Sequence, residues 1–120
     1  MQRKDFEQWV QGYLKAWSSN SPADIEALFT EDATYLTQAF REPWRGRAAI
    51  VKNWMQRTDD QGSWEFAYEI VAAEDDLGVL EGVTTYTQPA DGVYKNIWFI
   101  RLDADGRCRE FKEFWIQKEE

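Results

Sequence analysis

The sequence contains no histidine, one cysteine and three prolines in 120 residues. The absence of histidine excludes Ser-His and Cys-His catalytic pairs and histidine-ligated metal sites. The single thiol, Cys108, has no partner for a disulfide within the chain, so we expect a cytoplasmic protein. No apolar run approaches the roughly 20 residues of a membrane span, so no membrane contact is expected.

Positive charge is also scarce. Lys and Arg number 14 against 22 Asp and Glu, which gives a net charge of −8. Nucleic-acid affinity depends on Lys and Arg displacing counterions, so we expect no nucleic-acid partner.

Hydrophobic residues make up 43% of the chain and aromatic residues 16%, enough for a packed core. These values favour one folded domain over residues 1–120, and no motif indicates a metal or a cofactor.

Apolar side chains recur at three- and four-residue spacings in three segments, the pattern of amphipathic helices. The first segment spans residues 6–17. Ser21 followed by Pro22 predicts the start of a short second helix. A third helix is expected at residues 47–57. The second helix is predicted to bury Ile25, Leu28 and Phe29.

The period of the apolar pattern changes to two near Trp64, which is typical of strands. The strands are expected at residues 64–70, 79–87, 93–102 and 107–117, joined by turns at 75–78, 90–92 and 103–106. An earlier strand is predicted at 33–38, followed by an irregular connection at 40–46. Helices followed by an antiparallel meander indicate an α+β fold.

Several segments in this order resemble the SnoaL-like branch of the NTF2-like superfamily. They are residues 13–17 (YLKAW), 27–33 (ALFTEDA), 42–50 (EPWRGRAAI), 94–96 (YKN) and 106–115 (GRCREFKEFW). The resemblance implies a cone-shaped barrel, in which three N-terminal helices pack on a curved antiparallel sheet around a blind apolar pocket. It also implies a homodimer formed through the outer face of the sheet.

The resemblance further implies which side chains face the pocket, because alternate residues of each strand point inward. The ligand-binding residues expected on this basis are Tyr13, Trp17, Tyr35, Thr37, Trp54, Asn96, Trp98, Phe111 and Trp115. Most of them are aromatic. A wall of rings with few polar groups is typical of a site for a small apolar ligand.

Glu113 is the candidate catalytic residue, because it shares the inward parity of its strand. A carboxylate among aromatic rings loses hydration, so its pKa rises and it becomes a proton donor and acceptor near neutral pH. Asn96, at the matching parity of the preceding strand, is placed to orient this carboxylate or a ligand carbonyl. The alternative is a structural role, in which Glu113 pairs with Arg101, Arg109 or a helix lysine, or hydrogen-bonds a Tyr or Trp.

The ketosteroid isomerase relatives provide a second comparison. Tyr13 matches the position of their oxyanion-stabilising phenol, whereas Thr37 occupies the position of their carboxylate base and Trp98 that of their second donor. Ketosteroid isomerase activity is therefore not expected. The hydroxyl of Tyr13 is instead predicted to bond Glu113, Asn96 or water.

Two functions remain open. The first is an isomerase, lyase or hydrolase that acts on a small apolar molecule through Glu113. The second is a non-catalytic domain for ligand binding or dimerisation.

The outer face of the sheet is also predicted to be apolar, because Cys108, Phe114 and Ile116 have the opposite parity to the pocket residues. Exposed apolar patches commonly mark contacts, so this pattern also predicts a homodimer.

Overall fold

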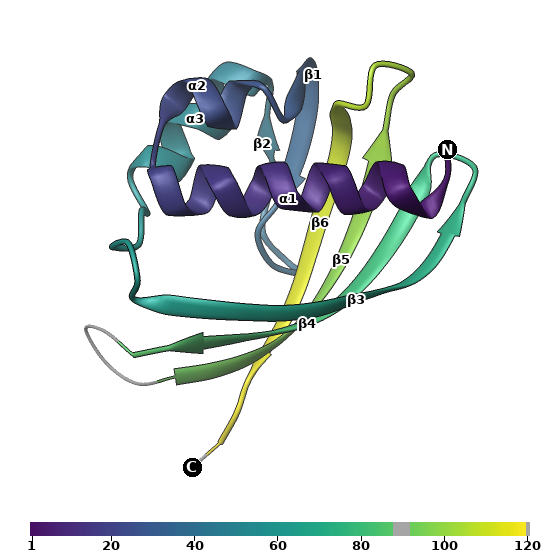
Figure 1. The fold of residues 1–120 in the computed structure, drawn as a ribbon. Coiled ribbons are helices and arrows are strands. Elements are labelled where there is room, and N and C mark those ends of the chain that lie inside the picture. Colours follow the sequence, from purple (N-terminus) through teal and green to yellow (C-terminus); the bar gives the residue numbers. More distant parts are fainter. Residues whose placement is uncertain (88–91, 120) are drawn as a thin grey trace.

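The computed structural model describes residues 1–87 and 92–119. In these residues, three helices lie over the concave face of one strongly curved, six-stranded sheet (Figure 1). The helices are α1 (Arg3–Ser19), α2 (Pro22–Glu26) and α3 (Arg47–Met55). The strands are β1 (Phe29–Leu36), β2 (Trp44–Arg45), β3 (Trp64–Glu74), β4 (Leu77–Tyr86), β5 (Gly92–Leu102) and β6 (Cys108–Gln117).

The sheet has the strand order β2-β1-β6-β5-β4-β3. Strands β3 to β6 form the expected antiparallel meander, and β1 joins its end by pairing with β6 in parallel. The α+β architecture predicted from the change of period is confirmed. Most of the turn predicted at residues 90–92 lies outside the described residues.

The first helix places the largest apolar face over the sheet. Its buried side chains are Phe6, Trp9, Val10, Tyr13 and Ala16, which recur at helical spacing. The helix ends at Ser19 and is capped by Asn20, whose φ of 54° lies in the left-handed region. Within the described part of the chain, no helix combines the length and the apolarity that a membrane crossing needs.

The second helix is shorter than predicted. It starts as expected, with the Ser21 side chain accepting a hydrogen bond from the Asp24 backbone, but it ends at Glu26. Phe29 begins β1 and is buried there, so the prediction of a helical Leu28 and Phe29 is wrong. The segment predicted to be irregular contains β2, which pairs with β1. Apolar spacing alone does not distinguish a helix end from the start of a buried strand.

The outer face of β6 differs from the prediction at Cys108. Arg101 pairs with Glu110, whereas the next residue of β5, Leu102, pairs with Cys108. One extra residue in β6, Arg109, therefore forms a bulge, which reverses the inward and outward alternation. Cys108 is fully buried as a result, and burial raises the pKa of its thiol to about 12. Phe114 and Ile116 lie beyond the bulge and keep the predicted outward direction.

The helix α1 and the sheet approach each other closely at Gly78 in β4. A Cβ atom built on Gly78 lies 2.4 Å from the ring of Phe6 in α1, which is far inside van der Waals contact. Phe6 is fully buried at this point. The glycine therefore allows the ring to lie directly on the strand and brings α1 close to the sheet.

We expect Gly78→Ala to lower the free energy of unfolding by about 1–3 kcal/mol, because the added methyl group overpacks this contact. Urea denaturation of the single variants and of the double variant with Phe6→Leu measures the effect. The smaller Leu side chain relieves the overlap, so the double variant loses less stability than the sum of the two single losses. Additive losses, or a neutral Gly78→Ala, contradict this packing.

Candidate functional site

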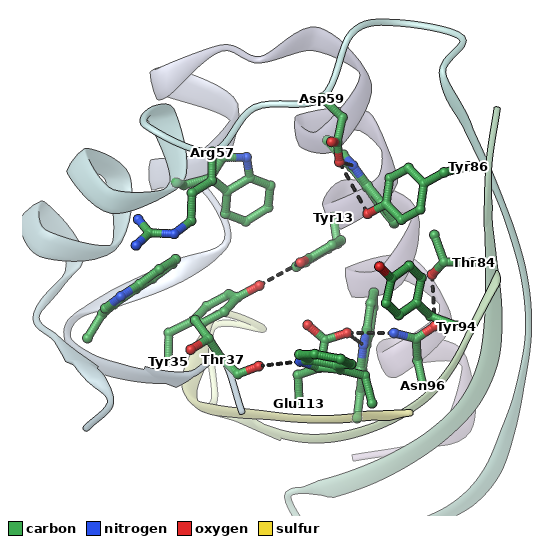
Figure 2. A pocket seen from close by; sticks show the side chains of 15 residues that line it. Tyr13, Tyr35, Thr37, Arg57, Asp59, Thr84, Tyr86, Tyr94, Asn96 and Glu113 are labelled. Carbon is green, nitrogen blue, oxygen red and sulfur yellow. Dashed lines mark hydrogen bonds between the residues drawn. The ribbon is translucent and has the colours of Figure 1, made fainter. Parts of the chain in front are cut away.

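A cavity of about 350 Å³ lies between the helices and the concave face of the sheet (Figure 2). Rings dominate its wall, and a few polar groups converge inside it. Its lining residues are Tyr13, Trp17, Tyr35, Thr37, Trp44, Trp54, Arg57, Asp59, Thr84, Tyr86, Tyr94, Asn96, Trp98, Glu113 and Trp115.

Nine of the ten residues that the sequence placed in the pocket line this cavity, and Phe111 does not. Phe111 is fully buried beneath the wall, with its ring centroid 4.5 Å from Tyr35 and 5.1 Å from Trp98. Inward parity places a side chain on the correct face of a strand, but it does not show whether other rings cover it. The functional roles assigned to these residues stay predictions.

Sequence reasoning missed part of the wall. Thr84 and Tyr86 come from β4, whose inward residues alternate as in the other strands, so the same parity argument identifies them. Arg57 and Asp59 follow α3 in an irregular segment with no periodic signal. Trp44 lies in the two-residue strand β2, which is too short to show a period.

Glu113 is held by two hydrogen bonds to the same oxygen. Its Oε2 accepts from Asn96 Nδ2 at 2.8 Å and from Trp98 Nε1 at 3.0 Å. Trp98 is the direct cross-strand partner of Glu113, and Asn96 lies two residues before Trp98 on β5. Both donors therefore reach the carboxyl group from the same inward face. In the described part of the chain, Oε1 accepts no hydrogen bond.

The pKa of Glu113 is raised above its ordinary value. Loss of hydration on burial is the main cause and outweighs the two donors, which favour the ionised form and lower the pKa. The arginine partners considered for Glu113 are engaged elsewhere. Arg101 pairs with Asp76 at 3.0 Å and with Glu110 at 3.4 Å, and Arg109 also pairs with Asp76. The predicted alternative of an arginine pair is therefore wrong, whereas the alternative of a tryptophan donor is confirmed.

Two phenols face the same cavity. The hydroxyls of Tyr13 and Tyr35 lie 2.7 Å apart and share one hydrogen bond. Tyr13 thus bonds Tyr35, which is not among the predicted partners Glu113, Asn96 and water. Burial is the main cause that raises the pKa of both phenols, and the nearby Glu113 adds to it. Both phenols therefore stay protonated. One of their two hydroxyl hydrogens forms the hydrogen bond between them, so the other hydroxyl hydrogen remains available to a ligand oxygen.

Stacked rings stiffen the walls. Phe66 stacks on Trp98 with centroids 4.9 Å apart, and Tyr35 stacks on Trp44 at the same separation. The ring centroids of Tyr13 and Trp98 lie 4.6 Å apart. Such contacts restrict the rings and keep the cavity apolar around the polar groups.

The segment after α3 borders the cavity opposite Glu113 (Figure 2). Asp59 Oδ2 accepts a hydrogen bond from Trp17 Nε1 at 2.9 Å and from the Tyr86 hydroxyl at 3.4 Å. The guanidinium of Arg57 lies 5.3 Å from the centre of the Trp44 ring, a cation–π contact. In residues 1–87 and 92–119, no group of three His, Cys, Asp or Glu side chains is arranged to hold a metal ion.

Comparisons with known proteins agree with the fold. A model of the SnoaL-like domain matches residues 10–111. A steroid delta-isomerase from Nocardioides simplex is 33% identical over 107 residues, which cover 88% of this chain and 85% of that protein.

Two solved structures share the architecture. A Kribbella flavida DSM 17836 protein described as a ketosteroid isomerase superposes with a TM-score of 0.72 at 19% identity, covering 98% of this chain and 82% of that one. An LEH-like epoxide hydrolase from M. tuberculosis gives 0.66 at 17% identity, covering 94% and 84%. These likenesses show the fold. With the family match over most of the sequence, they establish that the chain belongs to the SnoaL-like domain family, within the ketosteroid isomerase-related group of NTF2-like folds.

Proposed function

We propose that the protein is an enzyme that moves a proton on a small apolar carbonyl compound, with Glu113 as the acid and base. The observation that carries this proposal is the unequal state of the two carboxyl oxygens. Oε2 accepts both hydrogen bonds, whereas Oε1 accepts none from the described residues. A carboxyl group with a raised pKa and one uncommitted oxygen is suited to take up and return a proton.

The reaction proposed here needs no oxidant or reductant. The Glu113 carboxylate takes a proton from the carbon beside the carbonyl group, and the electron pair of that C–H bond forms an enolate. The enolate oxygen accepts a hydrogen bond from the Tyr13–Tyr35 pair, whose phenols stay protonated. In a substrate that carries a C=C bond next to that carbon, the enolate is a dienolate, and Glu113 returns the proton to its far carbon, which moves the double bond into conjugation with the carbonyl group.

The cavity supports a small and largely apolar substrate. Its volume of about 350 Å³ is at the lower end of the usual range of ligand pockets. The similarity to a steroid delta-isomerase supports isomerisation rather than hydrolysis or elimination. Thr37, directly after β1, stands where those enzymes carry their base, so in this chain the proton transfer is assigned to Glu113 on β6.

The second candidate is a non-catalytic domain that binds a small apolar ligand. The presence of Thr37 in place of a carboxylate base favours this function, since a hydroxyl group cannot accept the proton. The two candidates differ in one respect: only the enzyme needs the carboxyl group of Glu113, whereas binding needs only the shape of the cavity.

The Glu113→Gln variant tests the proposal. We expect it to bind small cyclic ketones as the wild type does, because the amide preserves the shape of the side chain. We expect exchange of the hydrogens beside the carbonyl, followed by proton NMR in deuterated water, to slow by about 100-fold or more. Glu110→Gln, an outward-facing change on the same strand, is the control and keeps the wild-type rate. Undiminished exchange in Glu113→Gln, or none in the wild type, favours the binding domain.

Glu113 also gives stability a specific pH dependence. Because its folded pKa is raised, the unfolded chain releases this proton at lower pH than the folded chain, and stability falls as pH rises through this window. We therefore expect Glu113→Gln to gain stability relative to the wild type as pH rises above the ordinary pKa of glutamate. Urea denaturation from pH 4 to pH 8 measures the difference. A Glu113→Gln variant that loses stability relative to the wild type as pH rises contradicts the raised pKa.

We also propose a homodimer through the outer face of the sheet. Phe40, in the loop between β1 and β2, is fully exposed, and Ile116 on β6 is 75% exposed. Both line a hollow of about 550 Å³, together with Ile97 and Phe114. A patch that carries both projecting side chains and a hollow is suited to two-fold pairing, since each copy can fill the hollow of the other.

Sedimentation at micromolar concentration tests the homodimer. We expect a mass of about twice the 14.2 kDa of one chain for the wild type. We expect Ile116→Glu to sediment as a monomer, because it buries a charge in the proposed contact. The control is Val71→Glu, an exposed position on β3 outside the hollow, which stays dimeric. A monomeric wild type rejects the proposal.

A further inference from the structure

Thr84 places a hydroxyl group on the inward face of β4, where a buried position normally carries an apolar side chain. The inward residues of this strand include Leu80 and Gly82, and Thr84 follows them with only 2% of its surface exposed. A buried hydroxyl group destabilises the fold unless it is hydrogen-bonded. The Thr84 hydroxyl donates to Asn96 Oδ1 at 2.8 Å, and Asn96 is itself 5% exposed.

This hydrogen bond determines which end of the Asn96 amide faces Glu113. With Oδ1 occupied by Thr84, the amide presents Nδ2 to Glu113 Oε2 at 2.8 Å. Trp98 Nε1 reaches the same oxygen at 3.0 Å. Both donors therefore end on Oε2, and the other carboxyl oxygen is directed toward the Tyr13–Tyr35 pair (Figure 2).

We propose that Thr84 is a positioning residue, whose hydroxyl orients the Asn96 amide so that the exchangeable proton of Glu113 resides on Oε1, the oxygen that faces the cavity. This inference rests on the proposed role of Glu113 as acid and base. Three residues on three neighbouring strands thus act in series, Thr84 on β4, Asn96 on β5 and Glu113 on β6. Thr84 itself contacts Asn96 and not the carboxyl group.

The remaining titratable groups around Glu113 are mostly neutral phenols, so the hydrogen bonds from Asn96 and Trp98 are its main polar contacts. Burial is the leading cause that raises the pKa of Tyr13, Tyr35 and Tyr86, so these phenols are neutral over the working pH range. The titratable and charged side chains that line the cavity with Glu113 are Tyr13 of α1, Tyr35 of β1, Arg57 and Asp59 after α3, Tyr86 of β4 and Tyr94 of β5.

The Thr84→Val variant tests the inference, because valine keeps the shape and removes the hydroxyl group. Asn96 Oδ1 then lacks its donor, the amide loses its fixed orientation, and Glu113 loses part of the donation that favours its ionised form. We expect the pKa of Glu113, measured by carbon-13 NMR of its side-chain carboxyl group, to rise by about 0.5–1 unit. We expect Thr84→Ser, which retains the hydroxyl, to keep the wild-type pKa.

Two further variants make the result decisive. Thr85→Val is the matched control, because it removes a hydroxyl from the adjacent residue on the opposite face of β4, and it leaves the pKa of Glu113 unchanged. Thr84→Ala also removes the hydroxyl and replaces Thr84→Val if the latter does not fold. An unchanged pKa without the hydroxyl, or an equal rise in Thr84→Ser, overturns the inference.

The NMR titration separates this inference from the proposed function. If the wild type catalyses no proton exchange but Thr84→Val raises the pKa of Glu113, the enzyme proposal fails and the positioning role stands. If exchange depends on Glu113 but the pKa does not respond to Thr84, the enzyme proposal stands and the positioning role fails. In the case that both hold, Thr84→Val shifts the pH profile of exchange in the same direction as the pKa.

Discussion

The site depends on the pair of hydrogen bonds that Trp98 and Asn96 donate to one oxygen of Glu113. Burying a carboxylate among rings is unfavourable, and without donors the side chain would stay protonated or turn toward water. Two donors on Oε2 offset part of this penalty, but the pKa of Glu113 stays raised because desolvation outweighs the two hydrogen bonds. The same arrangement leaves the second oxygen uncommitted and directed into the cavity.

The rest of the molecule sets the conditions for this arrangement. The antiparallel register of β5 and β6 places Trp98 directly opposite Glu113, on the curved sheet that α1 covers (Figure 1). Tyr13 of α1 contacts Trp98 through its ring and Tyr35 through its hydroxyl, so the helix closes the cavity and supplies a donor to it. The absence of histidine makes this carboxyl group the natural candidate for proton transfer near neutral pH.

Strand parity explains what could be predicted from the sequence. Glu113, Asn96 and Trp98 share an inward direction because side chains alternate along each strand, and their cross-strand contacts follow from the pairing of β5 with β6. Parity failed at Cys108, where a bulge reversed it, and at Phe111, where other rings cover an inward side chain. Asp59 lies outside any periodic element, so only the folded chain brings it to Trp17 and Tyr86.

The most direct test of this account is the titration of the Glu113 side-chain carboxyl group in the wild-type protein. Selective carbon-13 labelling and comparison with Glu113→Gln identify its resonance among the other acidic residues. The account predicts one titration with a midpoint above the ordinary pKa of glutamate, because desolvation outweighs the donors Trp98 and Asn96. A midpoint at or below that value contradicts it, since Glu113 would then be ionised and fully compensated, with no proton to exchange near neutral pH.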